Sequence, residues 1–491
     1  MTTTSKASTG LVKRVLVGRR VPSQRLEHTL LPKFLALPVF SSDAMSSVIY
    51  APEEILLVLL GASATAAHLV VPIATAIAVL MVIVVISYRQ TIRAYPNGGG
   101  AYIVSKDNLG VVPGLVAASA LLIDYVLTVS VSIVAGVIAI TSALPSLTNL
   151  RIELSVGFVL FIMLVNLRGA KESGTFFALP VYAFIVSIAV MVVIGVGRCV
   201  AGGCPQAPPV QPLATLATTA APIGLFVILR AFASGSAALT GVEAISNGVP
   251  AFRRPQAKNA GETLVLMAAI SIFMFLGIAF LASHAHAIPS EERSVVAQVA
   301  FAVFHGGPMF YVVQFFSAAI LVLAANTSFQ DFPRLSAILA RDRFMPRQFQ
   351  NRGDRLVFSN GVVVLAAFAI VLILVFDADL NRLIQLYVVG VFTSFTLSQT
   401  GMVRHWLKER HKGPAAAKGW QRSIVINTIG AITTFVVLIV VLITKFKHGA
   451  WIVVLATPLL VMLFLSINRH YEAVMRQLRQ RRVRPGAAGA N

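Results

Sequence analysis

The chain has 491 residues, of which 57% are hydrophobic and only 12% are charged. A soluble protein of this length carries about twice that share of charged residues, so the composition excludes an ordinary soluble domain and indicates a helical membrane protein with many spans. The formal net charge is +21, but the Lys and Arg residues gather in alternate loops and at the termini, as the positive-inside rule describes. We therefore expect membrane lipid around the chain and no nucleic-acid partner.

Residues 1–33 are polar and basic, and they contain no apolar stretch of the kind that a cleavable signal peptide needs. Residues 468–491 at the other end are also strongly basic. Because cytoplasmic segments carry an excess of Lys and Arg, both termini are predicted to be cytoplasmic. We therefore expect a multi-pass protein of a bacterial-type inner (plasma) membrane.

Twelve apolar segments lie between these two ends, and the loops that join them are alternately basic and weakly charged. The main exceptions to this alternation are Lys445 and Lys447, in the last predicted outer turn. A glycine-rich connection (residues 95–102, YPNGGGAY) follows the second segment, and its glycines permit close backbone approaches. The predicted spans are about 34–60, 67–88, 111–143, 152–168, 175–197, 219–250, 260–282, 308–329, 357–376, 380–403, 424–444 and 450–467.

Two of these segments are interrupted by polar and small residues. The first contains residues 37–54 (LPVFSSDAMSSVIYAPEE), in which four serines surround Asp43. The sixth contains residues 233–241 (ASGSAALTG), and Glu243 follows directly. An ionised carboxylate at the centre of a spanning helix costs about 3 kcal/mol on insertion scales. We therefore expect helices that are broken around a bound solute or ion.

The interrupted segments lie five spans apart, so the second copy of such a unit enters the membrane from the opposite side. The sequence therefore predicts an all-α membrane protein with a 5+5 inverted repeat and 12 transmembrane helices, of which helices 1 and 6 are discontinuous. The predicted domains are a basic cytoplasmic segment (1–33), the first repeat with its outer loop (34–218), the second repeat (219–404), accessory helices 11 and 12 (405–467) and a basic cytoplasmic tail (468–491).

Polar residues in the middle of spans one, three, six and ten are candidates for a binding site. Asp43 and Asp124 lie roughly half a bilayer from the cytoplasmic ends of their helices, and Thr240 and Glu243 lie at the interruption in span six. Together with Tyr387 they offer carboxylate, hydroxyl and phenol oxygens, which suit alkali or alkaline-earth cations. We predict no buried basic residue in these four spans, so the site should favour a cation.

Several of the polar residues also have a purely structural explanation. Asp43 can cap the N-terminus of an outer half-helix, where the helix dipole favours a carboxylate. Thr128 and Ser132, which share one helical face with Tyr125, can bond to carbonyls of their own helix. Tyr50 and Tyr125 can be packing residues with satisfied hydroxyls. These explanations stay open beside the functional ones.

Glu243 is harder to explain structurally, because an acid in mid-membrane without a basic neighbour is usually functional. Glu53 and Glu54 lie near the outer end of the first span and are expected to be solvated. The two cysteines, Cys199 and Cys204, lie in one loop. They can pair if that loop faces an oxidising exterior, and two free thiols are the alternative.

The interrupted first segment and the glycine-rich connection resemble the amino acid–polyamine–organocation (APC) superfamily, whose members have the LeuT/APC-type inverted-repeat fold. Residues 40–54 (FSSDAMSSVIYAPEE) resemble more specifically the KimA-type bacterial potassium importers, which are related to the KUP transporters. The resemblance covers the whole twelve-span region. It implies a secondary transporter that works by alternating access.

The resemblance also implies a role for each residue that matches the potassium importers' motifs. Asp43 and Asp124 are implied to hold ions on the path inward, and Glu243 is implied to carry the coupled proton. The residues implied to bind K⁺ are Asp43, Tyr50, Asp124, Tyr125, Thr128, Ser132, Thr240 and Tyr387.

We therefore expect a K⁺/H⁺ symporter, with an amino-acid or polyamine permease of the same superfamily as the alternative. The Ser- and Asp-rich first interruption argues against an amino acid, whose carboxylate needs half-helix amides. The sequence contains no nucleotide-binding loop and no nucleophile–base pair of the kind that would indicate an enzyme. No cofactor is expected, and the transported species are K⁺ and H⁺. The potassium importers dimerise through a cytosolic C-terminal domain that has no counterpart after the last predicted span, so a homodimer stays open.

Overall fold

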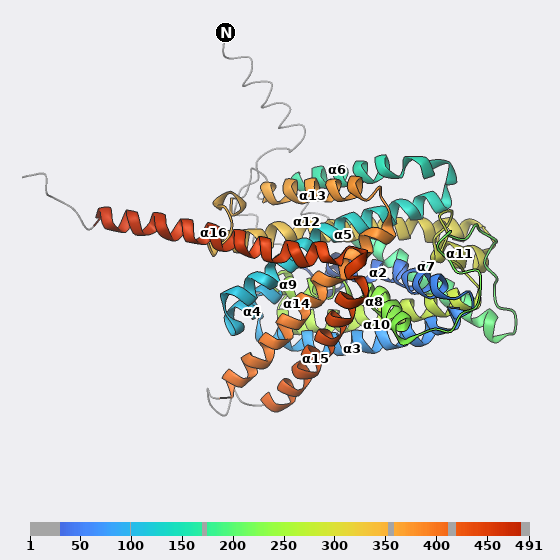
Figure 1. The fold of residues 1–491 in the computed structure, drawn as a ribbon, viewed down its shortest axis with the longest axis horizontal. Coiled ribbons are helices and arrows are strands. Elements are labelled where there is room, and N and C mark those ends of the chain that lie inside the picture. Colours follow the sequence, from blue (N-terminus) through green and yellow to red (C-terminus); the bar gives the residue numbers. More distant parts are fainter. Residues whose placement is uncertain (1–29, 99, 169–173, 352–357, 411–418, 483–491) are drawn as a thin grey trace, which may run out of the picture.

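The computed structural model describes residues 30–98, 100–168, 174–351, 358–410 and 419–482, and its regular elements there are helices (Figure 1). This confirms the predicted all-α fold class. The helices are α2 (Lys33–Ala62), α3 (Val70–Ala94), α4 (Gly100–Leu109), α5 (Val111–Ala143), α6 (Arg151–Leu167), α7 (Gly174–Val200), α8 (Leu225–Gly235), α9 (Ala244–Asn247), α10 (Gln256–His284), α11 (Val295–Phe304), α12 (Pro308–Arg341), α13 (Ser359–Val375), α14 (Leu380–Glu409), α15 (Trp420–Lys445) and α16 (Ala450–Arg482).

Within the described residues, 11 helical segments are long and apolar enough to cross a membrane, and they match 11 of the predicted spans. The remaining predicted span, 357–376, corresponds to α13, which has 17 residues. That length is at the lower end of what crosses the hydrocarbon core, so the count of twelve stays a prediction. The domain boundaries also stay predictions, and residues 1–29 and 483–491 of the two terminal domains lie outside the described part.

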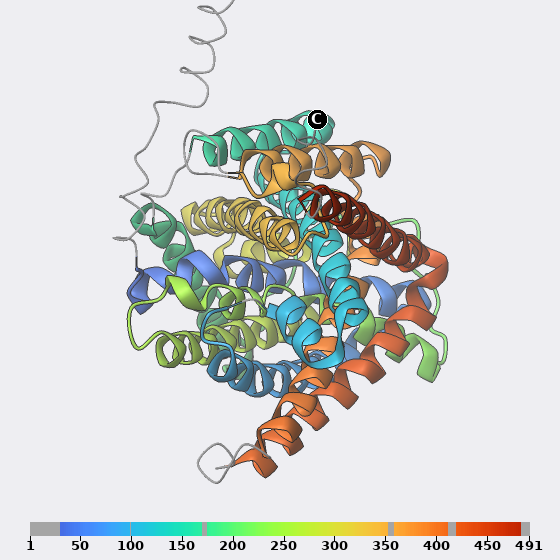
Figure 2. The same ribbon diagram turned by 90° about the vertical axis from the view of Figure 1, so that its left-hand side faces the viewer.

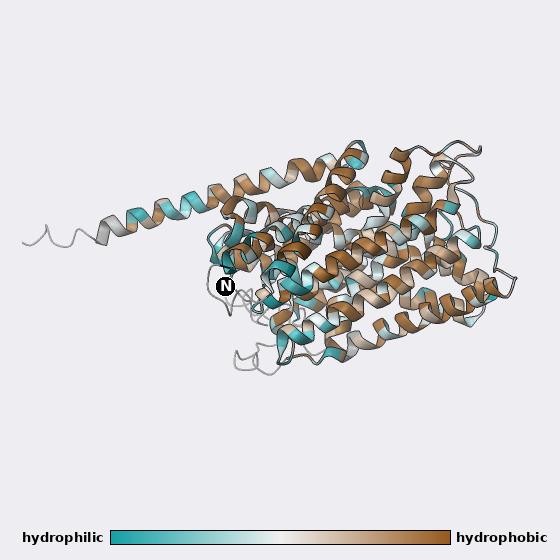
Figure 3. Ribbon diagram, turned by 90° about the horizontal axis from the view of Figure 1, so that it is seen from below, coloured by the Kyte–Doolittle hydropathy of each residue, from teal (hydrophilic) through white to brown (hydrophobic). Residues whose placement is uncertain are grey.

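The centre of the bundle is formed by α2 and α5, which are the most deeply buried of the spans. The two helices α12 and α14 pack against α5. Helices α6 and α13 lie side by side at one edge of the bundle, and α3 and α15 lie at the opposite edge (Figures 1 and 2). Apolar residues cover the helices along most of their length, while hydrophilic residues gather toward the ends (Figure 3).

One end of the bundle, which we call the basic end, is where α3 and α12 end and α10 begins. Two ion pairs tie its elements together. Lys33 Nζ lies 2.5 Å from Glu262 Oε2, and Lys106 Nζ lies 2.6 Å from Asp342 Oδ2. The basic residues at this end include Arg89, Arg93, Lys106, Arg253, Lys258, Arg334 and Arg341.

The glycine-rich connection lies at the basic end and packs against α9. Gly98 and Gly100 have left-handed φ angles of 72° and 52°. A Cβ atom at Gly98 would lie 2.8 Å from the carbonyl oxygen of Asn247, and one at Gly100 would overlap the Asn247 side chain. The predicted close backbone approach is therefore confirmed, since any side chain at these positions would push the connection away from α9.

The predicted break in the sixth span is present, but the predicted break in the first span is wrong. In the sixth, α8 ends at Gly235, a short 3₁₀ segment (Ser236–Leu239) follows, and α9 begins at Ala244. In the first, α2 runs without interruption through the serine-rich stretch. Hydroxyl groups can satisfy carbonyls without ending a helix, and both Ser46 and Ser47 donate to the carbonyl of Asp43 at 2.8 and 3.0 Å.

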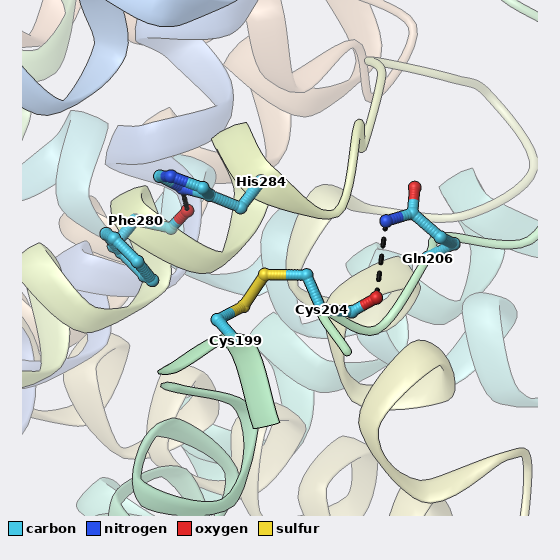
Figure 4. Close-up of a disulfide and its surroundings, with 5 residues drawn as sticks. All are labelled: Cys199, Cys204, Gln206, Phe280 and His284. Atoms are coloured by element: carbon cyan, nitrogen blue, oxygen red, sulfur yellow. Dashed lines mark hydrogen bonds between the residues drawn. A yellow bond between two sulfur atoms is a disulfide. The ribbon is translucent and has the colours of Figure 1, made fainter. Parts of the chain in front are cut away.

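At the end opposite the basic end, Cys199 and Cys204 form a disulfide that closes the last turn of α7 (Figure 4). Of the two alternatives that the sequence leaves open, the structure has the paired one. Close by, the imidazole of His284 stacks on the ring of Phe280 with 4.0 Å between the ring centroids. The disulfide therefore lies near the last turn of α10, at the end of the bundle opposite the basic end.

Candidate functional site

The break in the sixth span lies directly against the middle of α2. Thr240 is extended, with φ −63° and ψ 149°, and Gly241 has a left-handed φ of 78°. A Cβ atom at Gly241 would lie 2.7 Å from the Ala44 nitrogen and 2.8 Å from Asp43 Oδ2. Glycine is therefore required here for two reasons, the backbone angle and the space beside the Asp43 carboxyl.

A chain of hydroxyl groups joins α2 to this break. Ser47 Oγ lies 2.6 Å from Thr240 Oγ1, and the Tyr50 hydroxyl donates to Ser47 Oγ at 3.0 Å. All three side chains are buried. The structure thus brings the predicted residues Tyr50 and Thr240 together through Ser47, which is not among the predicted site residues. The only signal for Ser47 was its place in the serine-rich stretch.

A second pair of oxygens comes from α5 and α14. Thr128 Oγ1 donates to the Tyr387 hydroxyl at 2.9 Å, although the two residues are 259 positions apart. The Tyr387 hydroxyl in turn lies close to the Asp43 carboxyl and the Tyr50 hydroxyl. Neutral oxygens from α2, α5, α14 and the break therefore meet at one place, which we call the central cluster: Ser47, Tyr50, Thr128, Thr240 and Tyr387.

Three carboxyl groups surround the central cluster without an ion-pair partner among the described residues. Asp43, Asp124 and Glu243 have exposed fractions of 6, 1 and 2%, and Asp43 Oδ1, Asp124 Oδ1 and Glu243 Oε2 accept no hydrogen bond. Glu243 acts electrostatically on both aspartates. Burying a carboxylate without a partner costs several kcal/mol. The arrangement therefore favours a bound cation, a bound proton, or both.

Two predicted residues do not join the cluster. The Tyr125 hydroxyl accepts a 3.1 Å hydrogen bond from Asn247 Nδ2 and lies toward the basic end. Ser132 Oγ is fully buried and has no hydrogen-bond partner in the described structure. Tyr125, Thr128 and Ser132 share a helical face, but that face of α5 extends beyond the cluster, so residues on it can lie outside the cluster. Only Thr128 is bonded to another member.

Two predictions about charges in the outer half of the bundle are wrong: that Glu53 and Glu54 are solvated, and that span six has no buried basic residue. Glu54 is only 1% exposed rather than solvated, and Glu53 Oε2 accepts from the backbone nitrogen of Val295 at 3.1 Å. Arg230, on α8, and the fully buried Lys445, on α15, both act electrostatically on Glu54. Lys445, the exception to the loop-charge alternation, is thus a buried base whose Nζ has no hydrogen-bond partner among the described residues. Span six contains a partly buried base, Arg230, against the prediction.

Comparison with known proteins identifies the family. The model of the family described as "Amino acid permease" matches residues 35–465. The chain belongs to the amino acid permease family. This membership confirms a membrane transporter and agrees with the broken sixth span and the helical bundle.

The sequence is 47% identical over 468 residues to the potassium transporter KimA of Bacillus subtilis, covering 95% of this chain and 76% of that protein. It is 24% identical over 361 residues to the low-affinity putrescine importer PlaP of Escherichia coli, covering 69% and 74%. Among solved structures, the manganese transporter of Eremococcus coleocola aligns over 94% of this chain and 98% of that one, with 11% identity and a TM-score of 0.48.

Proposed function

We propose that this permease-family protein imports K⁺ together with H⁺ by alternating access. The observation that carries the proposal is a central cluster of neutral oxygens surrounded by three buried acids that have no ion-pair partner among the described residues. Oxygen ligands of this kind suit a hard monovalent cation. The 47% identity to a protein named as a potassium transporter supports K⁺ in particular.

Each part of the site has a role in this proposal. Tyr50, Thr128, Thr240 and Tyr387 supply neutral oxygens to the cation, together with Ser47, which bridges two of them. The predicted ligands that lie elsewhere or lack bonds, Tyr125 and Ser132, are not needed for this cluster.

The acids have separate tasks. Asp43 and Asp124 hold the cation on its path inward, and Glu243 carries the coupled proton. Glu243 precedes α9 at the break itself, where a change in the angle between α8 and α9 would alter its access to water. No enzymatic step or resident cofactor is part of this cycle.

The orientation follows from charge and disulfide chemistry. We place the basic end in the cytoplasm because positively charged segments stay inside. The Cys199–Cys204 disulfide then lies on the outer side, where an oxidising environment preserves it. Both lines of reasoning give the same orientation in a bacterial inner membrane.

A polyamine permease is the second candidate, because one relative is named as a putrescine importer. A diamine carries two positive charges, and the acids Asp43 and Glu243 lie within electrostatic reach of each other. The hydroxyls of the central cluster bond one another at 2.6 to 3.0 Å, so they must separate to admit any ligand, and a single ion such as K⁺ requires a smaller separation than a carbon chain does.

Uptake by purified protein in liposomes distinguishes the two candidates. Radioactive Rb⁺ should accumulate, unlabelled K⁺ should compete fully, and Na⁺, putrescine and amino acids should compete weakly. Uptake of labelled putrescine with no Rb⁺ flux would contradict the proposal and favour the polyamine permease.

A further inference from the structure

A cavity of about 550 Å³ lies at the end of the bundle opposite the basic end. Its lining includes Leu57, Val58 and Gly61 of α2, Arg230 of α8 and Gln385 of α14. That volume is far more than the roughly 30 Å³ that one water takes up in the liquid, so a hydrated ion can enter. We call it the outer cavity, because the proposed orientation places it on the outer side.

One face of α2 connects the outer cavity to the central cluster. Ser47 and Tyr50 belong to the cluster, Glu54 follows Tyr50 by four residues, and Leu57 and Gly61 on the cavity wall follow Glu54 by three and seven. Residues at these spacings share one face of a helix. Glu54 therefore lies about one helical turn from Tyr50 and about one turn from Leu57, between the cavity and the cluster.

The polar oxygens at this level of the bundle lack donors. Glu54 is buried, and its Oε2 has no hydrogen-bond partner among the described residues. Gln385 on the cavity wall is also buried, and its Oε1 is in the same condition. Leaving buried acceptors without a partner is costly. Carboxylate and amide oxygens of this kind are the ligands that replace the water of an alkali cation.

A buried base acts on Glu54 from a neighbouring helix. Lys445 of α15 is fully buried, and its Nζ donates no hydrogen bond to any described residue. Among the charged groups around Glu54, Lys445 acts on it most strongly, and Glu53, Asp379 and Arg230 also contribute. An ammonium and a carboxylate thus lie near each other between the outer cavity and the cluster, and each has an atom without a hydrogen-bond partner.

We propose that Glu54 is the outer entry site for the transported cation, and that the Lys445 ammonium is a tethered cation that occupies this site in the closed state. The entering ion replaces Lys445 beside Glu54, and Lys445 returns once the ion moves on to the central cluster. Each carries a single positive charge, so the exchange avoids leaving an isolated carboxylate buried. This inference rests on the proposed cation transport and adds an outer step to it.

The apparent KM for external Rb⁺, measured by uptake into cells that express the full chain, tests this entry site. Lys445→Gln should lower the KM about tenfold, because a nearby charge changes the affinity of a carboxylate for a cation by that order. Glu54→Gln should raise the KM about tenfold, because the amide keeps the shape and loses the charge. The double variant should match Glu54→Gln, because Lys445 acts through Glu54.

The chain offers a matched control for each change. Lys447→Gln removes the same charge two residues later, where the side chain is exposed. Glu53→Gln removes the neighbouring acid, whose Oε2 accepts from the Val295 nitrogen instead. Both controls should keep the KM of the unmodified protein. A merely structural role for Lys445 or Glu54 would lower the amount of protein and the maximal rate without moving the KM.

The outcomes separate the entry site from the proposed function. A KM that Lys445→Gln leaves unchanged, or lowers equally in the Glu54→Gln background, would overturn the tethered cation. If Lys445→Gln does not reach the membrane, Glu54→Gln decides alone, and an unchanged KM in that variant overturns the entry site. In each of these cases the unmodified protein still takes up Rb⁺ and the proposed function stands. No Rb⁺ uptake by the unmodified protein would overturn the proposed function itself.

Discussion

At the scale of single residues, the central cluster depends on Ser47, which bonds Tyr50 on one side and Thr240 on the other. Ser47→Ala should weaken the apparent affinity for K⁺ about tenfold, because a lost cation ligand or its anchor costs on the order of 1–3 kcal/mol. Competition of K⁺ with Rb⁺ uptake measures this. The control is Ser46→Ala, whose hydroxyl donates to the same Asp43 carbonyl but reaches no cluster residue. Equal affinities in the two variants would mean that Ser47 only supports its own helix.

The sequence predicted the kinds of chemical group at the site better than it predicted which residues form the site. Residue types reveal hydroxyl groups and acids that are unusual in a membrane span, and seven of the nine predicted site residues lie in or beside the cluster. Which hydroxyls meet depends on how α5 and α14 are rotated against α2, and no short-range pattern encodes that rotation. For this reason Ser47 was missed and Tyr125 lies elsewhere. The burial of Glu54 was missed because Lys445, a base that acts electrostatically on it, is almost 400 residues away in the sequence.

At the scale of elements, the break in the sixth span depends on Gly241. Gly241→Ala should abolish uptake and lower thermal stability, because a Cβ there would push against Ala44 and the Asp43 carboxyl. Fluorescence-detected gel filtration after heating and Rb⁺ uptake measure the two effects. Gly202→Ala is the matched control: its φ of 87° is also left-handed, but nothing lies within 4 Å of the added atom. It should show only the backbone cost of about 1 kcal/mol. Similar losses in both variants would contradict a specific contact between the break and α2.

The two interrupted segments show how far a sequence pattern predicts an element. Ser, Gly and Asp in an apolar stretch indicate that something unusual occurs, but the outcome depends on whether glycine is present. In the sixth segment α8 ends at Gly235, whose φ of −68° is ordinary, and Gly241 then adopts a left-handed φ of 78° between the 3₁₀ segment and α9. The first has serines instead, and their hydroxyls bond back to the Asp43 carbonyl while α2 continues.

At the scale of the whole molecule, the orientation can be tested with the chain's own two cysteines. Cys199→Ser leaves Cys204 as the single thiol, and a membrane-impermeant maleimide should label it in intact cells. A Lys258→Cys variant with both native cysteines changed to serine should be labelled only after the cells are opened, since Lys258 lies at the basic end. The reverse labelling pattern would place the basic end outside and contradict the proposed direction of transport.

The overall architecture was the part most accessible from the sequence, because hydropathy and loop charge act over the whole chain. Eleven spans follow from apolar length alone. What apolar length does not give is which spans are central. Helices α2 and α5, which carry the buried acids Asp43, Glu54 and Asp124, form the centre, and this agrees with the cost of exposing carboxylates to lipid.

The most direct test of proton-coupled K⁺ import is Rb⁺ uptake into liposomes with and without an inward pH gradient, for the unmodified protein and for Glu243→Gln. Gln keeps the shape of a protonated Glu243 but cannot exchange a proton. We expect the gradient to drive accumulation in the unmodified protein and to have no effect on the variant, while K⁺/Rb⁺ exchange survives because it needs no net proton movement. If Glu243→Gln responds to the gradient as fully as the unmodified protein does, Glu243 does not carry the proton and the proposed coupling is wrong.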